Sequence, residues 1–180
     1  MADFFTSITD KQIAFIDKQP MFFTASACAT GRINLSPKGM DSFRVLSPNL
    51  CGYMDMVGSG NETAAHIKND GRLTIMFNSF TRNPLILRLY GRGRVARPGS
   101  ADFELYKDRF TFNAGTRQII LIEVESIQES CGYAVPEMTL EKERPTLQKF
   151  AEAKGVEALK DYQIEKNSIS IDGFDTGLSD

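Results

Sequence analysis

Hydrophobic and polar positions alternate in short segments along most of the first 126 residues, a pattern that favours β-strands over helices. Apolar-rich segments cover residues 21–29, 32–36, 43–47 and 51–56, and turn-forming Gly, Pro and Asn residues separate them. Turn signals that recur every eight to twelve residues or so are typical of an antiparallel meander, sandwich or barrel. The sequence therefore predicts a mainly β fold with peripheral helices.

Three further strands complete this pattern after a helical interruption. Residues 73–80 and 85–96 form two long apolar-rich segments with a polar turn between them. Residues 118–126 alternate apolar and charged side chains, as expected of a strand with one face in water.

Helix signals lie at the start and in the middle of the chain. Thr9 or Asp10 can cap a short helix over residues 11–17. Ser59 stands three residues before Glu62, which is the spacing of a capping box, ahead of a second helix that Gly71 ends. A further helix is expected over residues 101–109.

The C-terminal part of the chain has a different texture. Residues 137–166 carry seven acidic and six basic residues, with apolar residues at roughly helical spacing. This predicts a surface helix or a helix pair, because about thirty residues are too few for an independent core. We expect one domain over residues 1–180, with residues 137–180 as a helical and extended C-terminal extension.

Composition narrows the location and the metal chemistry. No apolar run approaches the roughly 18 residues of a membrane helix, and no secretory signal is visible. The three cysteines are odd in number and form no C-x-x-C pair, which suits a reducing cytoplasm. The single histidine, His66, excludes zinc sites that need two or three imidazoles, and no metal is expected.

The net charge of −2 conceals an uneven distribution. Residues 21–97 hold ten Lys or Arg and four Asp or Glu, so this stretch carries +6 and the remainder −8. A chain that is not basic overall is a poor candidate for nucleic-acid binding. A basic block inside it is what a small anionic ligand requires.

Two enzyme signatures are absent or misleading. Gly91 and Gly93 match the letters of a dinucleotide fingerprint, but Pro98 and Gly99 break the chain where its helix should run, so strand bends or bulges explain the glycines better. There is no G-x-S-x-G motif, and His66 has no identifiable nucleophile beside it. His66 is more simply a packing or helix-surface residue.

The segment from Ser36 to Thr63 carries a candidate phosphate site. A short loop can bring Lys38 and Arg44 together, and a glycine-rich turn leads into a helix N-terminus, whose free N–H groups favour anions. The hydroxyl of Thr63 can complete such a cradle. An ordinary capped helix with two surface cations fits the same residues, and the spacing alone does not separate the two interpretations.

Several motifs, taken in order, resemble the pyridoxamine 5′-phosphate oxidase-related flavoproteins, in particular an uncharacterised branch of that family. The resemblance extends from about Ile13 to Gly173. Its motifs are Phe22-Phe23-Thr-Ala-Ser-Ala, Gly31-Arg-Ile-Asn-Leu-Ser-Pro-Lys-Gly39, Phe43-Arg-Val-Leu46, Gly58-Ser-Gly-Asn-Glu-Thr63, Ala65-His-Ile67, Leu87-Arg-Leu-Tyr-Gly-Arg-Gly-Arg-Val95, Cys131-Gly-Tyr-Ala-Val-Pro136 and Asn167-Ser-Ile-Ser-Ile-Asp-Gly173.

This resemblance implies an FMN-binding split β-barrel and a homodimer with FMN at the subunit interface. It places cofactor-binding residues on two strands, a loop, a turn and the second subunit. The implied residues are Ser36 and Lys38 on the loop, Arg44, Val45 and Leu46 on the strand near flavin and phosphate, Met54 and Asp55 beside the isoalloxazine ring, Asn61, Glu62 and Thr63 on the phosphate-binding turn, and Tyr133 from the partner subunit.

Two departures from the oxidases proper bear on activity. Glu62-Thr63 stands where those enzymes have an Arg-Lys pair, so positive charge must come from Lys38, Arg44 or Arg88. Ile86 stands where they place a glutamine beside the flavin. The sequence therefore predicts an FMN-dependent oxidoreductase acting on an unidentified small molecule rather than on pyridoxamine phosphate. The alternative is a non-catalytic flavin or haem carrier or sensor, and no residue is assigned a catalytic role.

Overall fold

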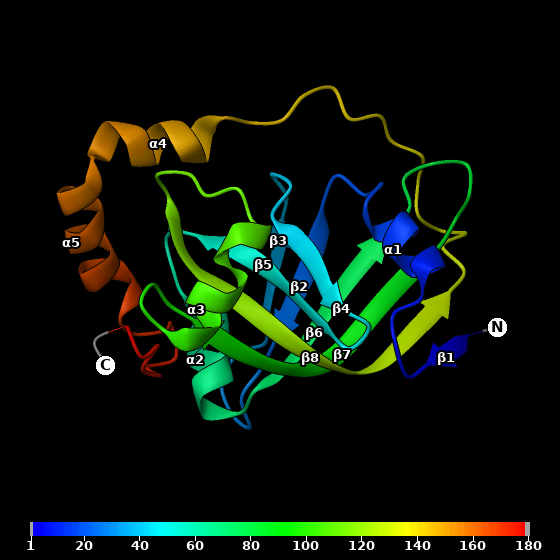
Figure 1. Ribbon diagram of the computed structural model, residues 1–180, viewed down its shortest axis with the longest axis horizontal. Helices are drawn as coiled ribbons and strands as arrows, with labels where there is room; N and C mark the ends of the chain where they lie inside the picture. The colour runs from blue at the N-terminus through cyan, green and yellow to red at the C-terminus, as the bar shows by residue number, and fades with distance from the viewer. Residues whose placement is uncertain (1, 179–180) are drawn as a thin grey trace.

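An antiparallel sheet of eight strands, strongly curved, forms the body of the molecule (Figure 1). The structure is a computed structural model that describes residues 2–178. The strand order is β3-β2-β6-β7-β8-β5-β4, and β1 pairs with β8 off this path. The strands are β1 Asp3–Phe5, β2 Phe22–Ser26, β3 Asn34–Lys38, β4 Phe43–Ser47, β5 Leu50–Met56, β6 Arg72–Asn78, β7 Ile86–Ala96 and β8 Thr116–Ser130. Because β3 and β4 are the two ends of this order, the sheet does not close, and the predicted split β-barrel is confirmed.

The two longest strands, β7 and β8, pair along nearly the whole length of β7 and carry the bend of the barrel. Their register shifts between Tyr90 and Gly91. A Cβ atom added at Gly91 would lie 2.0 Å from the backbone oxygen of Glu123, so only glycine fits this close approach. The prediction that Gly91 marks a strand bulge, and not a dinucleotide-binding turn, is confirmed.

Aromatic packing fills the main core inside the curved sheet. Phe22, Phe43 and Phe77 are buried, with ring centroids 4.9–5.4 Å apart. These distances are typical of stabilising aromatic pairs. Cys51 is fully buried and Cys28 is half-buried, and no disulfide joins cysteines within residues 2–178. The apolar strand positions thus serve packing, as the sequence indicated.

Helices cover the rim of the barrel. They are α1 Asp10–Ile16, α2 Glu62–Asn69, α3 Ala101–Tyr106 followed by the 3₁₀ helix η1 Lys107–Arg109, α4 Thr146–Lys154 and α5 Val156–Asn167. Thr9 caps α1 in a capping box with Gln12. No helix within the described residues is both long and apolar enough to span a bilayer.

The C-terminal extension is a helix pair joined to β8 by an irregular segment. Figure 1 shows residues 131–145 crossing above the sheet before α4 and α5 descend along one side. Ala151 and Leu159 pack with Val57, which follows β5, in a small separate cluster. The predicted helix pair is confirmed, and it packs against the barrel through this cluster.

Candidate functional site

A cavity of about 350 Å³ lies where the N-terminus of α2 meets β3 and the end of β5. We call it the α2 cavity. It combines one strand edge, one glycine-rich turn and the start of β8. Its lining residues are Asn34, Ser36, Pro37, Lys38, Asp55, Met56, Gly58, Ser59, Gly60, Asn61, Glu62, Thr63 and Arg117.

Strand β3 supplies one wall of the α2 cavity through alternate residues. Asn34, Ser36 and Lys38 fall on one face, because strand side chains alternate with a period of two. The Ser36 hydroxyl donates to Asn34 Oδ1 at 3.0 Å, and Asn34 Nδ2 donates to Thr63 Oγ1 at 3.1 Å. These contacts fix β3 against α2. The strand runs two residues beyond the predicted boundary, so Lys38 lies on a strand and not in a loop.

Charged side chains form the floor of the α2 cavity around Asp55. Lys38 Nζ lies 3.0 Å from Asp55 Oδ1, and Arg117 Nη2 lies 2.7 Å from Asp55 Oδ2. Burial alone would raise the pKa of the Asp55 carboxyl, but the two cations and a hydrogen bond from Gln118 outweigh it and hold that pKa well below its usual range. Asp55 is therefore ionised at neutral pH and positions both cations.

The start of α2 has no side-chain cap. Asn61 is the N-cap residue, yet its side chain makes no hydrogen bond to the helix. Its Oδ1 instead accepts from Gln118 Nε2 at 2.9 Å. The first-turn N–H groups of a helix have no intrahelical acceptor. In α2 the Asn61 side chain does not accept from these N–H groups, so they remain available to a ligand in the cavity.

The predicted capping box between Ser59 and Glu62 is wrong. The Glu62 carboxylate accepts the backbone N–H of Ile171 at 3.0 and 3.2 Å, so it is held by the C-terminal tail. Glu62 is the first residue of α2 and not its third, because the N-cap residue is Asn61 and not Ser59.

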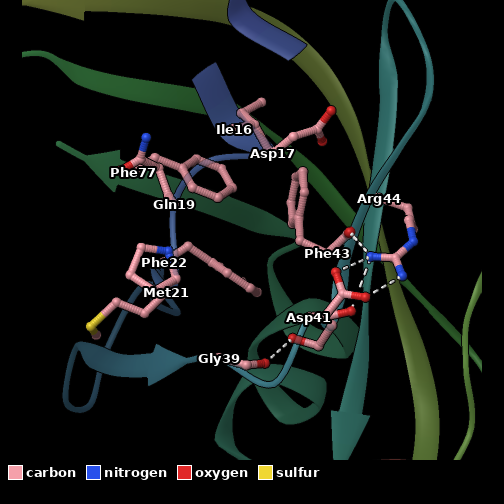
Figure 2. A pocket seen from close by; sticks show the side chains of 12 residues that line it. Ile16, Asp17, Gln19, Met21, Phe22, Gly39, Asp41, Phe43, Arg44 and Phe77 are labelled. Carbon is pink, nitrogen blue, oxygen red and sulfur yellow. Dashed lines mark hydrogen bonds and ion pairs between the residues drawn. The ribbon is translucent and has the colours of Figure 1, made fainter. Parts of the chain in front are cut away.

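Arg44 lies outside the α2 cavity, and the prediction that it stands beside Lys38 is wrong for the single chain. Its guanidinium pairs with the Asp41 carboxylate through two contacts of 2.8 Å. Met40 and Asp41 adopt left-handed φ values of 62° and 51°. This turn directs Arg44 to a separate cavity of about 250 Å³, shown in Figure 2, which Phe22 and Phe43 also line.

The remaining predicted residues also lie outside the α2 cavity lining. Val45, Leu46 and Met54 pack into the two barrel cores. Arg88 Nη1 donates to Ser130 Oγ at 3.1 Å, and Tyr133 is 83% exposed. The structure thus brings together Ser36, Lys38, Asp55, Asn61, Glu62 and Thr63, and it separates them from Arg44, Val45, Leu46, Met54, Arg88 and Tyr133.

His66 is a buried packing residue beneath the cavity. Its Nδ1 atom lies 3.0 Å from Ser26 Oγ. Ser26 Oγ also accepts from Asn34 Nδ2 at 3.3 Å, so His66 connects to the cavity wall through one serine. No group of three or more His, Cys, Asp or Glu side chains suited to a metal ion occurs among residues 2–178.

Two residues outside the predicted site, Arg117 and Asn167, connect the floor of the α2 cavity to its glycine-rich turn. Arg117 Nη1 donates to Asn167 Oδ1 at 2.6 Å and to the Gly60 carbonyl at 3.2 Å. Asn167 Nδ2 donates to the Gly58 carbonyl at 3.1 Å. Arg117 stands directly before the predicted strand of residues 118–126, and a cation buried there needs an anionic partner. Asn167 is the first residue of the C-terminal motif of the family resemblance, but that motif does not predict a contact with Arg117.

Comparison with known proteins identifies the family. A sequence model described as pyridoxamine 5′-phosphate oxidase matches residues 8–131. The chain is 38% identical over 194 aligned positions to the pyridoxamine 5′-phosphate oxidase family protein ustO from Aspergillus flavus, covering 97% of this chain and 77% of that protein.

Two solved structures share the fold at low identity. HupZ from Group A Streptococcus is 23% identical, with a TM-score of 0.51, and the match covers 67% of this chain and 91% of that chain. An FAD-binding protein from Mycobacterium smegmatis is 8% identical, with a TM-score of 0.51, and the match covers 70% of this chain and 97% of that chain. The family match covers strands β2 to β8 and all the residues that line the α2 cavity. The chain belongs to the pyridoxamine 5′-phosphate oxidase family.

Proposed function

We propose that the protein binds FMN in the α2 cavity, with the phosphate held by Lys38, Thr63 and the first turn of α2. The observation that carries this proposal is the uncapped helix start within reach of an ordered ammonium group. Free N–H groups at a helix N-terminus favour phosphate, and a lysine adds a charge-assisted hydrogen bond. Asp55 keeps Lys38 at the wall of the cavity at 3.0 Å.

The placement of the charges in the cavity supports an anionic ligand, although the two cations and two carboxylates of its lining balance formally. Lys38 and Arg117 lie together on the floor and share the buried carboxylate of Asp55. The Glu62 carboxylate is taken up by the Ile171 N–H. A phosphate monoester bound here would therefore meet cations and N–H donors, with both carboxylates already engaged.

The proposed assembly is a homodimer with FMN at the subunit interface. Ile33 and Leu35 are 77% and 65% exposed, and they alternate with Asn34 and Ser36, which line the cavity. Exposed apolar side chains beside a ligand site support a protein contact there. Arg44, Arg88 and Tyr133 lie outside the cavity of one chain, so any contact they make with FMN comes from the partner subunit.

The proposed activity is FMN-dependent oxidation or reduction of a small molecule. FMN, when bound, supplies the electron-transfer chemistry, and the protein supplies binding and orientation. Family membership and the shared fold of the FAD-binding protein from Mycobacterium smegmatis support this proposal. We assign no catalytic residue. Glu62 and Thr63 replace the basic pair of the oxidases proper, so pyridoxamine phosphate is not the proposed substrate. A cytoplasmic location and a single domain over residues 1–180 stay predictions.

A flavin titration tests this proposal. Purified protein is titrated with FMN and with riboflavin, and binding is followed by quenching of flavin fluorescence. We expect FMN to bind more tightly than riboflavin, and Lys38→Met to weaken FMN alone by about 10- to 100-fold, the worth of one charge-assisted hydrogen bond. Lys160→Met, which removes a surface cation paired with Glu157, is the matched control. Equal affinity for both flavins, or no binding, contradicts the proposal.

A further inference from the structure

A larger cavity, of about 540 Å³, adjoins the α2 cavity. It lies between the residues around Lys38 and the segment that crosses above the sheet, and we call it the crossing cavity. Pro37 and Lys38 line both cavities. A molecule in the crossing cavity would therefore lie beside a ligand in the α2 cavity, with only these two residues at the boundary.

Apolar side chains dominate the walls of the crossing cavity. Met21 and Met40 come from the barrel side, and Leu140 and Leu147 come from the crossing segment and α4. Methionine side chains are flexible and polarisable, so they adapt to ligands of different shape. The volume falls within the roughly 300–1,000 Å³ range of small-molecule sites. These features fit a ligand with an apolar body.

Two cations on the crossing segment favour a ligand that also carries an anionic group. Lys142 and Arg144 line the cavity, and neither has an ion-pair or hydrogen-bond partner among residues 2–178. The cations of α5 differ, because Lys160 and Lys166 are each paired with a neighbouring glutamate. Glu143 is the sole acidic residue of the lining, so the wall keeps an excess positive charge.

We propose that the crossing cavity is the substrate site, and that the substrate is a small molecule with an apolar body and a carboxylate or similar anionic group. Lys142 and Arg144 would bind the anion, while the methionine and leucine side chains hold the apolar part. The role as substrate site rests on the proposed flavin site, because only adjacency to FMN makes this cavity a place of reaction. The binding preference rests on the cavity itself.

A pair of fluorescent probes tests this binding preference. Anilinonaphthalene sulfonate has an aromatic body and an anionic group, and phenylnaphthylamine has a similar body without the anion. We expect the FMN-saturated protein to bind about one sulfonate probe per chain. The double variant Lys142→Gln and Arg144→Gln should weaken the sulfonate probe by about fivefold, as expected for two exposed charge contacts, and leave the neutral probe unchanged.

Two further variants locate the probe. Leu140→Ser should weaken both probes, because it removes apolar wall that they share. The double variant Lys160→Gln and Lys166→Gln removes two cations from α5 and should change neither probe. Equal sulfonate affinity in the wild type and in the Lys142 and Arg144 variant overturns the proposal. A second titration uses protein without FMN: displacement of the bound probe by added FMN also overturns the proposal, because the probe would then occupy the α2 cavity.

The same samples also test whether a second copy of the chain occupies the crossing cavity, and they separate failure of this proposal from failure of the flavin proposal. Light scattering after size exclusion gives the molar mass of each variant. If Leu140→Ser converts a dimer into a monomer, the cavity is a contact with a second copy and the substrate proposal is wrong. If FMN fails to bind while the probes behave as expected, the flavin site is refuted and the anion-selective cavity stands.

Discussion

Replacing Arg117 by methionine tests the buried network that links the barrel to its C-terminal extension. The Arg117 and Asp55 side chains are each 4% exposed and pair at 2.7 Å. Removing one partner of a buried pair costs about 3–5 kcal/mol, because the other charge stays buried. Lys38 remains 3.0 Å from Asp55, so the lower end of this range applies.

The carbonyl of Gly60 and the Oδ1 atom of Asn167 also lose their donor in this variant. Gly60 lines the cavity, where water can replace part of its lost contact, whereas Asn167 is fully buried. We therefore expect Arg117→Met to lower the free energy of unfolding by about 3–4 kcal/mol. For a chain of this size the fall corresponds to roughly 6–16 °C in melting temperature.

Urea unfolding followed by far-ultraviolet circular dichroism suits this measurement, because the chain has no tryptophan. The matched control is Arg72→Met, which breaks a pair between Arg72 and Asp70 in which Arg72 is 62% exposed. Exposed pairs contribute at most about 1 kcal/mol. If Arg117→Met lowers the free energy of unfolding no more than Arg72→Met does, the buried pair contributes no more to stability than an exposed pair, and the reasoning is refuted.

Two further predictions concern acid stability and the barrel bend. Because the folded pKa of Asp55 lies below its unfolded value of about 3.9, its contribution to the free energy of unfolding is present above that pH and is lost as the pH falls below it. In urea unfolding, the difference in free energy between wild type and Asp55→Asn should stay constant from neutral pH to about 5 and shrink under about 4. A difference that widens on acidification would contradict this. Gly91→Ala places a Cβ atom 2.0 Å from the Glu123 carbonyl oxygen, whereas the Cβ atom of Gly58→Ala meets no atom within 4 Å. Thermal unfolding should show that Gly91→Ala lowers the free energy of unfolding by about 3 kcal/mol or fails to fold, and that Gly58→Ala changes it little. Equal melting temperatures of the two variants would refute the steric argument.

The strands were predictable because their signal is local. Alternating apolar positions and turn residues in residues 21–96 report which face each strand buries, and the observed β4 matches the predicted bounds of Phe43–Ser47. Gly91 was interpreted correctly for the same reason, since its neighbours rule out the helix that a dinucleotide turn requires. Helix α3 was predicted too long, because Lys107–Arg109 continue the chain as a 3₁₀ turn.

The site was only partly predictable because its geometry depends on long-range contacts. Ser59 and Glu62 have the spacing of a capping box, but Ile171, more than one hundred residues away, offers Glu62 a competing donor. Lys38 and Arg44 are close in sequence, but two left-handed residues between them change the direction of the chain. Local spacing gives candidate partners, and the tertiary structure decides which partner is closer.

The C-terminal extension supports the α2 cavity through contacts with its lining residues, although none of its own residues lines it. Asn167, at the end of α5, is fully buried and contacts both Arg117 and the Gly58 carbonyl. It therefore ties the floor of the α2 cavity to the turn that precedes α2. The uncapped helix start depends on this arrangement, because Asn61 Nδ2 reaches the Asn167 carbonyl at 3.5 Å while its Oδ1 is held by Gln118. If Asn61 were released from these two partners, its side chain could cap α2 and compete with a phosphate. The extension thus holds the start of α2 uncapped, as the proposed phosphate site requires, although it lies outside residues 8–131 that match the family model.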